Sequence, residues 1–334
     1  MATEPAGSPE PDPQTLAEAV LAGRRAAVST ALNWVDDSRP THRERALELL
    51  DALEGRGRGV RIGVTGAPGA GKSTLLDALV AGLRRRERTV GILAVDPSSR
   101  RSGGALLGDR MRLGAGARDS GVFLRSLAAR DQLGGLSEVT GPSLDVLVAA
   151  FDAVFVETVG VGQSESEVTC LVDSLVFVAQ PASGDLIQFM KAGILEWPDI
   201  FFVNKADLGD AAERTVAELR AGLELGMRRD ATRMAPVLCG SARDGIGIDE
   251  LIAALDAHQQ HLAERGEVAE RRRIGRLHRV RNALATRYGR YGLARLNDTL
   301  GLEGFVGGRP EASVERLVDL LGREIERSFA ADGL

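Results

Sequence analysis

The sequence is poor in cysteine and has no surplus of basic side chains, and both shortages argue against certain functions. Only two of the 334 residues are cysteines, Cys170 and Cys239, and they lie far apart and form no CxxC pair. This spacing favours buried, reduced thiols over a disulfide framework. The 42 lysines and arginines are outnumbered by 47 acidic residues, for a formal net charge of -5. Nucleic acid is therefore not expected to be the main partner.

Long apolar runs are missing as well. No uninterrupted hydrophobic stretch approaches the length of a membrane-spanning helix. The opening MATEPAGSPEPDPQTL is acidic and proline-rich, whereas a signal peptide has a basic start and an apolar stretch. These observations predict a cytoplasmic protein with no membrane partner and a disordered N-terminus over residues 1–13.

Hydrophobic periodicity divides the remaining chain into three parts. Residues 14–58 carry apolar side chains at helical spacing with a break at SRPTHRE, which predicts an N-terminal helical hairpin. Residues 59–262 alternate short apolar runs, such as RIGVT, GILAVD and DAVFVET, with helical patterns. This alternation is typical of a mostly parallel sheet flanked by helices, an α/β fold. Residues 263–334 have a helical pattern throughout and predict an appended arm, with Ser313 capping its last helix.

Two charged helical stretches allow more than one interpretation. RRRIGRLHRVR, from Arg271 to Arg281, could bind nucleic acid, but the acidic residues before it and its apolar stripe favour a solvated helix face. His258, His261 and Glu264 share a helix face and could ligate a metal. This pattern in a charged helix is more often solvated, and no cysteine stands nearby to complete a metal site.

GAPGAGKS is the most specific local motif, because it fits GxxxxGK[ST]. It stands between the expected strand RIGVT and a helical pattern, the context of a phosphate-binding loop. Glycines let backbone N–H groups turn toward phosphate oxygens, Lys72 reaches the β- and γ-phosphates, and Ser73 can ligate magnesium. The residues expected to hold the nucleotide here are Gly66, Ala67, Pro68, Gly69, Ala70, Gly71, Lys72, Ser73 and Thr74.

NKAD, which follows the apolar run DIFFV, identifies the base. Asn204, Lys205 and Asp207 then stand at the carboxyl end of a strand, where doubly wound sheets bind ligands. A carboxylate there can accept hydrogen bonds from N1–H and the amino group of guanine, a donor pair that adenine lacks. The later segment GSARDGIG adds a loop over the base, with Ser241, Ala242 and Arg243. The expected ligands are therefore GTP and GDP.

Two acidic residues close expected strands near the phosphate loop. Asp96 ends GILAVD and Glu157 ends DAVFVE, so both carboxylates should point into the crevice near Ser73. Magnesium prefers oxygen ligands and usually keeps several waters, so one carboxylate would hold Mg2+ and the other its waters. Gly160, just beyond, can offer its N–H to the γ-phosphate.

With these motifs the chain resembles the MeaB-type GTPases, also called ArgK-like, which accompany adenosylcobalamin-dependent methylmalonyl-CoA mutase. AVDPSS, RSLAAR, FDAVFVETVGVGQSE and NKADL stand in the family's order, and the resemblance runs from about Leu16 to Leu262. It implies a magnesium-dependent P-loop GTPase that is a homodimer through its C-terminal arm. Its nucleotide state would gate adenosylcobalamin delivery to the mutase, or to a related acyl-CoA mutase, and would protect or reactivate that enzyme.

The resemblance also assigns roles to individual residues. Lys72, Asp96, Asp109 and Glu157 would serve hydrolysis, and Ser73, Asp96, Asp109 and Glu157 would serve the metal. GDLIQFMKAG corresponds to a switch segment in which Asp185, Gln188 and Lys191 would contact the partner. Met111 departs from the family at a position where a hydroxyl could contact phosphate or metal. Phe189–Met190 departs from it on the partner surface, which leaves open which acyl-CoA mutase is the partner. Direct contact with an adenosyltransferase is also left open.

Two other functions stay open from the sequence. A metallochaperone GTPase that inserts nickel or zinc would need a Cys/His cluster at ligand spacing, which the sequence does not show. A phosphotransferase acting on a transport-related protein is the third alternative, against which the guanine motif weighs.

Overall fold

The centre of the protein is a single sheet in which neighbouring strands run parallel. The structure is a computed structural model and describes residues 11–37, 39–96, 119–128, 136–158, 164–181, 194–224, 234–299 and 301–331. The seven strands of the sheet lie in the order β3-β2-β4-β1-β5-β6-β7. They are β1 (Val60–Thr65), β2 (Val90–Asp96), β3 (Val122–Ala128), β4 (Ala153–Glu157), β5 (Ser174–Ala179), β6 (Ile200–Val203) and β7 (Val237–Cys239). The expected α/β fold class is confirmed.

Helices cover both faces of this sheet, which explains why its strands read as continuous apolar runs. Ile62 and Phe155 pack against α4 and α9 on one face, while Val154 and Val156 pack against α5 on the other. Phe177, on the same face as α5, lies under α8. The covering helices are α4 (Lys72–Arg85), α5 (Thr140–Ala150), α6 (Ser164–Thr169), α8 (Asp210–Glu224) and α9 (Ile248–Glu264), with short 3-10 turns η3 (Ile194–Glu196) and η4 (Ala206–Leu208).

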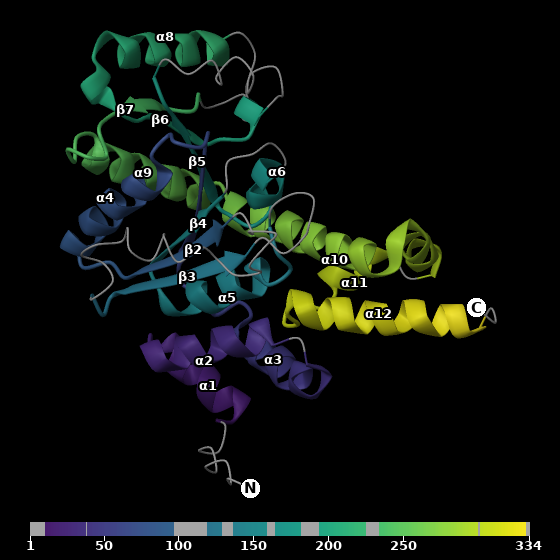
Figure 1. Cartoon of the computed structure of the whole chain (residues 1–334). Coiled ribbons are helices and arrows are strands. Elements are labelled where there is room, and N and C mark those ends of the chain that lie inside the picture. Colours follow the sequence, from purple (N-terminus) through teal and green to yellow (C-terminus); the bar gives the residue numbers. More distant parts are fainter. Residues whose placement is uncertain are drawn as a thin grey trace, which may run out of the picture.

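The N-terminal extension consists of three helices, one more than the expected hairpin. They are α1 (Pro13–Leu21), α2 (Arg25–Asp36) and α3 (Pro40–Leu53). Gly23 has a φ of 68°, in the left-handed region that glycine tolerates, and this turn separates α1 from α2. The three helices bury Leu16, Val28 and Leu50 in one cluster with residues of α5. Figure 1 shows them stacked on α5, away from the sheet.

The C-terminal arm is formed by α10 (Glu267–Thr299), α11 (Leu302–Gly307) and α12 (Val314–Ala331). Figure 1 shows α10 and α12 side by side and reaching beyond the sheet, and Leu284, Leu317 and Leu321 are buried between them. Gly289 interrupts α10 with a non-helical φ of 67°. Within the described residues, no helix is long and apolar enough to cross a membrane.

The start of α12 is held from the opposite end of the chain. Ser313 Oγ accepts a hydrogen bond from the Arg316 N–H at 3.2 Å, which confirms the expected cap. Asp51, near the end of α3, in turn accepts from Ser313 N at 2.8 Å and from Ser313 Oγ at 2.7 Å. The same carboxylate is paired with Arg316 at 2.7 Å. The N-terminal helices therefore fix the first turn of the arm's last helix.

Two predictions about charged helices were wrong in whole or in part. The stretch Arg271–Arg281 is solvated on one side only: Arg273 and Ile274 are exposed, whereas the Arg276 and Arg279 side chains are each only 13% exposed and pair with Glu54 and Asp145. His258 is also buried, with its Nδ1 at 2.6 Å from Ser174 Oγ and its Nε2 at 3.4 Å from Asp199. In both cases, acidic or polar partners from distant parts of the chain replace water.

The sheet core yields a prediction about stability. Phe155 in β4 is completely buried among side chains of β1, β2 and α4. Phe155→Ala should lower the free energy of unfolding by about 3–5 kcal/mol, because it removes a large apolar side chain and leaves a cavity. Urea denaturation measures this change, with Ile274→Ala as a control. Ile274 is 51% exposed, so its loss should cost less than about 0.5 kcal/mol. A loss below about 1 kcal/mol for Phe155→Ala would contradict the packing.

Candidate nucleotide-binding site

The glycine-rich loop connects β1 to α4 and depends on glycine at two close approaches. Gly66 has a φ of 142° and Gly71 a φ of 90°, backbone angles that residues with a Cβ rarely adopt. A Cβ at Gly66 would collide with the carbonyl oxygen of Val178 in β5, and one at Gly71 with the side-chain amide of Asn204. The loop can therefore lie directly against β5 and against the guanine motif, where α4 begins with backbone N–H groups available to an anion.

Lys72 lies within this loop. Its side chain curls back so that Nζ donates to the carbonyl oxygen of Gly66 at 2.8 Å and to that of Ala67 at 3.2 Å, and the residue is only 8% exposed. Pro68 and Gly69, by contrast, are exposed at the tip of the loop. The ammonium group is thus fixed inside the loop, where phosphate oxygens would need its positive charge.

The hydroxyl and carboxylate expected at the metal contact each other. Ser73 Oγ donates to Glu157 Oε1 at 2.8 Å, because pairing of β1 with β4 sets Glu157 opposite Val64. Asp96 ends β2 on the next strand, but its side chain lies outside the described part. Asp109 and Gly160 lie outside the described residues altogether. Within the described part, no group of three or more His, Cys, Asp or Glu side chains could hold a metal.

The donor set nevertheless fits magnesium. A hydroxyl and a carboxylate are hard oxygen ligands, and Mg2+ in nucleotide sites takes few protein ligands because phosphates and waters supply the others. Because the Ser73 hydroxyl donates its hydrogen bond to Glu157, the lone pairs of the Ser73 oxygen stay available to an ion. Glu157 can therefore orient Ser73 as well as bind the ion's waters.

Asn204 joins three loops at the carboxyl end of the sheet. Its Nδ2 donates to the Ala70 carbonyl oxygen at 2.9 Å, and its Oδ1 accepts from the Ala242 N–H at 3.0 Å. The residue follows β6 and is 3% exposed. Both ends of its amide are thus engaged, one in the phosphate loop and one in the GSAR loop. Asn204 therefore connects the phosphate loop to the GSAR loop.

Asp207 is held by the GSAR loop. Its Oδ1 accepts from Ser241 Oγ at 3.2 Å, and its Oδ2 lies 3.3 Å from a guanidinium nitrogen of Arg243. Asp244 binds the same two residues, and its hydrogen bond with Arg243 lowers the pKa of its carboxyl group. The Asp207 side chain remains 30% exposed. A carboxylate has about four acceptor positions, so it keeps capacity for the guanine donors.

Sequence reasoning missed three residues near this site. Gln180 follows β5 and accepts from Lys205 Nζ at 3.0 Å, while the same Nζ donates to the Gly69 carbonyl oxygen at 2.7 Å. The signal was a polar residue directly after the apolar run SLVFVA. Asp244 also carried a signal, since it belongs to GSARDGIG. Asp77 lies one turn after Ser73 on α4, and no local motif points to it. Burial raises the pKa of its carboxyl group to about 6.

The phosphate loop and the guanine motif meet at one edge of the sheet, bridged by Asn204, so one crevice can bind both ends of a guanine nucleotide. This arrangement defines a P-loop GTPase. A sequence model of the family described as "Methylmalonyl Co-A mutase-associated GTPase MeaB" matches residues 28–288. The chain belongs to this family.

Curated relatives come from bacteria, archaea and an animal, and the bacterial and archaeal ones are named as GTPases. A probable GTPase of Mycobacterium tuberculosis is 43% identical over 262 residues, which cover 77% of this chain and 78% of the relative. GTPase ArgK of Escherichia coli is 36% identical over 263 residues, 77% of this chain and 80% of the relative. The mitochondrial methylmalonic aciduria type A homolog of Mus musculus is 35% identical over 268 residues, 76% of this chain and 64% of the relative.

A solved structure shares nearly the whole fold. The crystal structure of an LAO/AO transport system kinase superposes with a TM-score of 0.68 at 26% sequence identity. The match covers 96% of this chain and all of the other, so it includes the helices that flank the sheet domain.

The position of Lys72 generates a prediction about catalysis. Lys72→Ala should weaken GTP and GDP binding and slow hydrolysis by a factor on the order of 10²–10³, because it removes a fixed positive charge from the phosphate loop. Phosphate release and nucleotide titration measure the two effects. The circular dichroism spectrum and melting temperature of the variant control for misfolding. Unchanged turnover would contradict the role of the loop.

The contacts of Asp207 generate a prediction about the base. Asp207→Asn replaces two acceptors by one acceptor and one donor, which matches xanthine better than guanine, so preference should shift from GTP toward XTP by about 100-fold or more. Competition binding with both nucleotides measures the ratio. Asp244→Asn, which changes the neighbouring carboxylate on Ser241, is the matched control and should keep the guanine preference. An undiminished preference for GTP in Asp207→Asn would refute the assignment.

Proposed function

We propose that this GTPase is a magnesium-dependent chaperone whose nucleotide state gates the delivery of adenosylcobalamin to methylmalonyl-CoA mutase or a related acyl-CoA mutase. In this role it protects or reactivates the mutase. The observation that carries the proposal is the match of residues 28–288 to a family described by its association with that enzyme. The name of the mouse relative, which refers to methylmalonic aciduria, supports the same partner.

In this proposal each part of the crevice has one task. Lys72 and the backbone N–H groups of the loop bind the phosphates, and Asp207 binds guanine. Ser73 and Glu157, together with Asp96 and Asp109, hold Mg2+, which when bound neutralises negative charge on the phosphate oxygens. Gly160 offers its N–H to the γ-phosphate. Glu157 keeps the Ser73 hydroxyl oriented through the hydrogen bond described above.

The segment GDLIQFMKAG would carry the nucleotide signal to the mutase. It follows β5, whose carboxyl end lies beside the phosphate loop, and Asp185, Gln188 and Lys191 within it lie outside the described residues. These residues belong neither to GAPGAGKS nor to NKAD, so in this role they would contact the partner. Isolated protein should hydrolyse GTP slowly, and docking of the partner should accelerate it.

The remaining parts of the chain serve assembly in this proposal. Residues 1–13 are a disordered N-terminus, residues 14–58 a helical extension, residues 59–262 the GTPase domain and residues 263–334 a homodimerisation arm. The protein acts in the cytoplasm. An adenosyltransferase would be a second contact if cofactor is transferred directly between the proteins.

The switch assignment is tested with Gln188→Ala and Lys191→Ala. Both variants should keep intrinsic hydrolysis and nucleotide affinity. The stimulation of hydrolysis by the mutase should fall at least about tenfold, because the variants remove partner contacts and not nucleotide contacts. Hydrolysis with and without mutase, and cofactor loading of the mutase with GTP or GDP, measure the coupling. Arg214→Ala, at an exposed position on α8, is the control. Variants that remain fully stimulated and still gate loading would contradict the assignment.

The alternatives have their own signatures in the same experiments. Copurification with a nickel or zinc enzyme in place of a mutase would favour a metallochaperone. Transfer of labelled phosphate from GTP to an amino-acid side chain of a transport-related protein would favour a phosphotransferase.

A further inference from the structure

The edge of the sheet opposite the phosphate loop contains a cavity. β1 begins there, and α10 of the arm meets the end of α3 and one side of α5. The cavity has a volume of about 350 Å³ and is bordered by all three parts of the chain. Glu54 and Asp145 are its acidic lining residues, against six arginines: Arg61, Arg271, Arg272, Arg273, Arg276 and Arg279. We call this space the arginine cavity.

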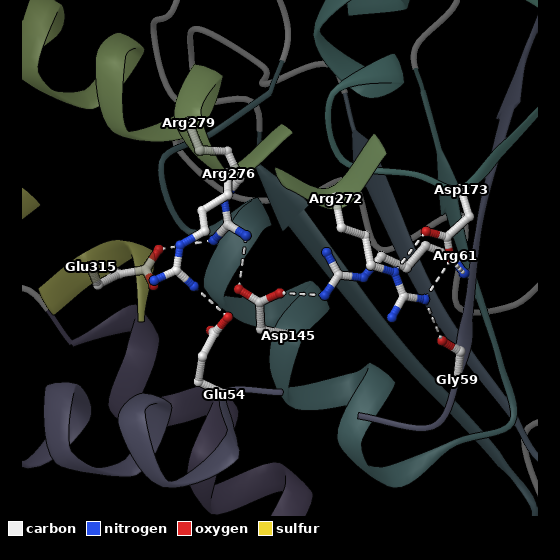
Figure 2. A network of polar contacts seen from close by, with 9 residues as sticks. All are labelled: Glu54, Gly59, Arg61, Asp145, Asp173, Arg272, Arg276, Arg279 and Glu315. Atoms are coloured by element: carbon white, nitrogen blue, oxygen red, sulfur yellow. Dashed lines mark hydrogen bonds and ion pairs between the residues drawn. The ribbon is translucent and has the colours of Figure 1, made fainter. Parts of the chain in front are cut away.

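Figure 2 shows Arg61, Arg272, Arg276 and Arg279 of this wall, with Asp145 between Arg61 and Arg279. This carboxylate accepts from Arg61 at 3.1 Å and from Arg279 at 2.8 Å, so two guanidinium groups share it. Arg279 also pairs with Glu315 of α12 at 3.0 Å. Arg276 donates to Glu54 at 2.5 Å and, through its other terminal nitrogen, to backbone carbonyl oxygens between α11 and α12.

The remaining arginines are paired away from the centre. Arg272 donates to Asp173 at 2.7 Å and to the Gly59 carbonyl oxygen at 3.3 Å. Arg273 pairs with Glu270 one turn earlier on α10, at 2.8 Å, and the side chains of both are more than half exposed. Neither Asp173 nor Glu270 lines the cavity. Much of the compensating negative charge therefore lies outside the cavity wall.

Hydrogen-bond donors exceed acceptors in this wall. Each guanidinium group carries five N–H donors and no acceptor. The buried Nε atoms of Arg61 and Arg276 have no hydrogen-bond partner within the described part of the chain. Buried polar groups of this kind are rare in proteins, where a partner, a water or an ion normally satisfies them. The chemistry that complements such a wall is a compact group rich in acceptor oxygens.

Electrostatics favours the same complement. Burial raises the pKa of Glu54 to about 7, so near neutral pH this carboxylate is only partly ionised and neutralises Arg276 incompletely. Burial opposes the charge on Arg279, but Asp145 and Glu315 outweigh it and raise the pKa of this arginine. Arg279 thus stays charged, while Glu54 on the same wall loses part of its charge.

We propose that the arginine cavity binds a small polyanion with several acceptor oxygens, such as a diphosphate or a tricarboxylate. Arginine forks match carboxylate and phosphate oxygens in pairs, which single surface lysines do not. The volume of about 350 Å³ lies near the lower end of the roughly 300–1,000 Å³ of small-molecule sites. It therefore suits a compact anion better than a whole nucleotide.

Binding there would be linked to docking of the arm. The cavity wall is complete only while α10 and the segment Val306–Val314 rest on the sheet domain and on α3. A ligand that binds only this docked state stabilises it by mass action. The site lies at the opposite edge of the sheet from the GTP crevice, so its occupancy does not depend on the proposed function.

The test uses full-length protein kept in excess GDP, so that added anions do not enter the phosphate loop. Inorganic pyrophosphate and citrate are titrated separately by calorimetry, and sodium chloride at matched ionic strength is the reference. At least one anion should bind and raise the melting temperature beyond the chloride reference. Lys72→Ala should retain this binding, which separates it from the GTP crevice.

Arg273→Gln is the informative variant, because Arg273 is the most exposed arginine of the wall and its loss should leave the fold intact. It should weaken anion binding at least about tenfold. Arg281→Gln, on the same helix but outside the wall, is the matched control and should not change it. Binding of pyrophosphate alone would specify a phosphate ligand, and binding of citrate alone a carboxylate ligand. No stabilisation beyond chloride, or equal weakening in both variants, would overturn the proposal without affecting the assignment of the GTP crevice.

Discussion

The common direction of the strands is the constraint from which the rest of the molecule follows. Because neighbouring strands are parallel, their carboxyl ends collect at one edge of the sheet and their amino ends at the other. The first edge brings the phosphate loop, Glu157 and the guanine motif together although they are far apart in the sequence. The second edge receives α10 of the arm and the end of α3, while the N-terminal helices pack on α5. Two chemically different surfaces therefore result from one topological choice.

Within the first edge, the side-chain amide of Asn204 converts neighbouring loops into one site. It hydrogen-bonds to the phosphate loop through Ala70 and to the GSAR loop through Ala242. The phosphate loop and the GSAR loop are therefore linked through one side chain, so a shift of either loop would strain the hydrogen bond of Asn204 to the other. Gly71 is part of the same contact, since only a residue without Cβ lets the amide approach so closely.

Much of the fold and the chemistry of the site could be predicted from local sequence. The strands were recognisable because burial on both faces requires continuous apolar runs, and GAPGAGKS and NKAD carry their chemistry in a few adjacent residues. The role of Asn204 as a brace was not predictable, because its partners come from two other loops. The arginines of α10 were misjudged for the same reason: the carboxylates of Glu54 and Asp145, which remove them from water, are more than a hundred residues away.

The contact between Asp51 and the first turn of α12 has a consequence for biosynthesis. A chain emerges from the ribosome N-terminus first, so the helix carrying Asp51 exists long before Ser313 and Arg316 are made. The last helix can thus begin on a carboxylate that is already in place. A protease cut that released the N-terminal helices would remove the Asp51 carboxylate that holds Ser313, the cap of α12, and the arm would lose this anchor at its base.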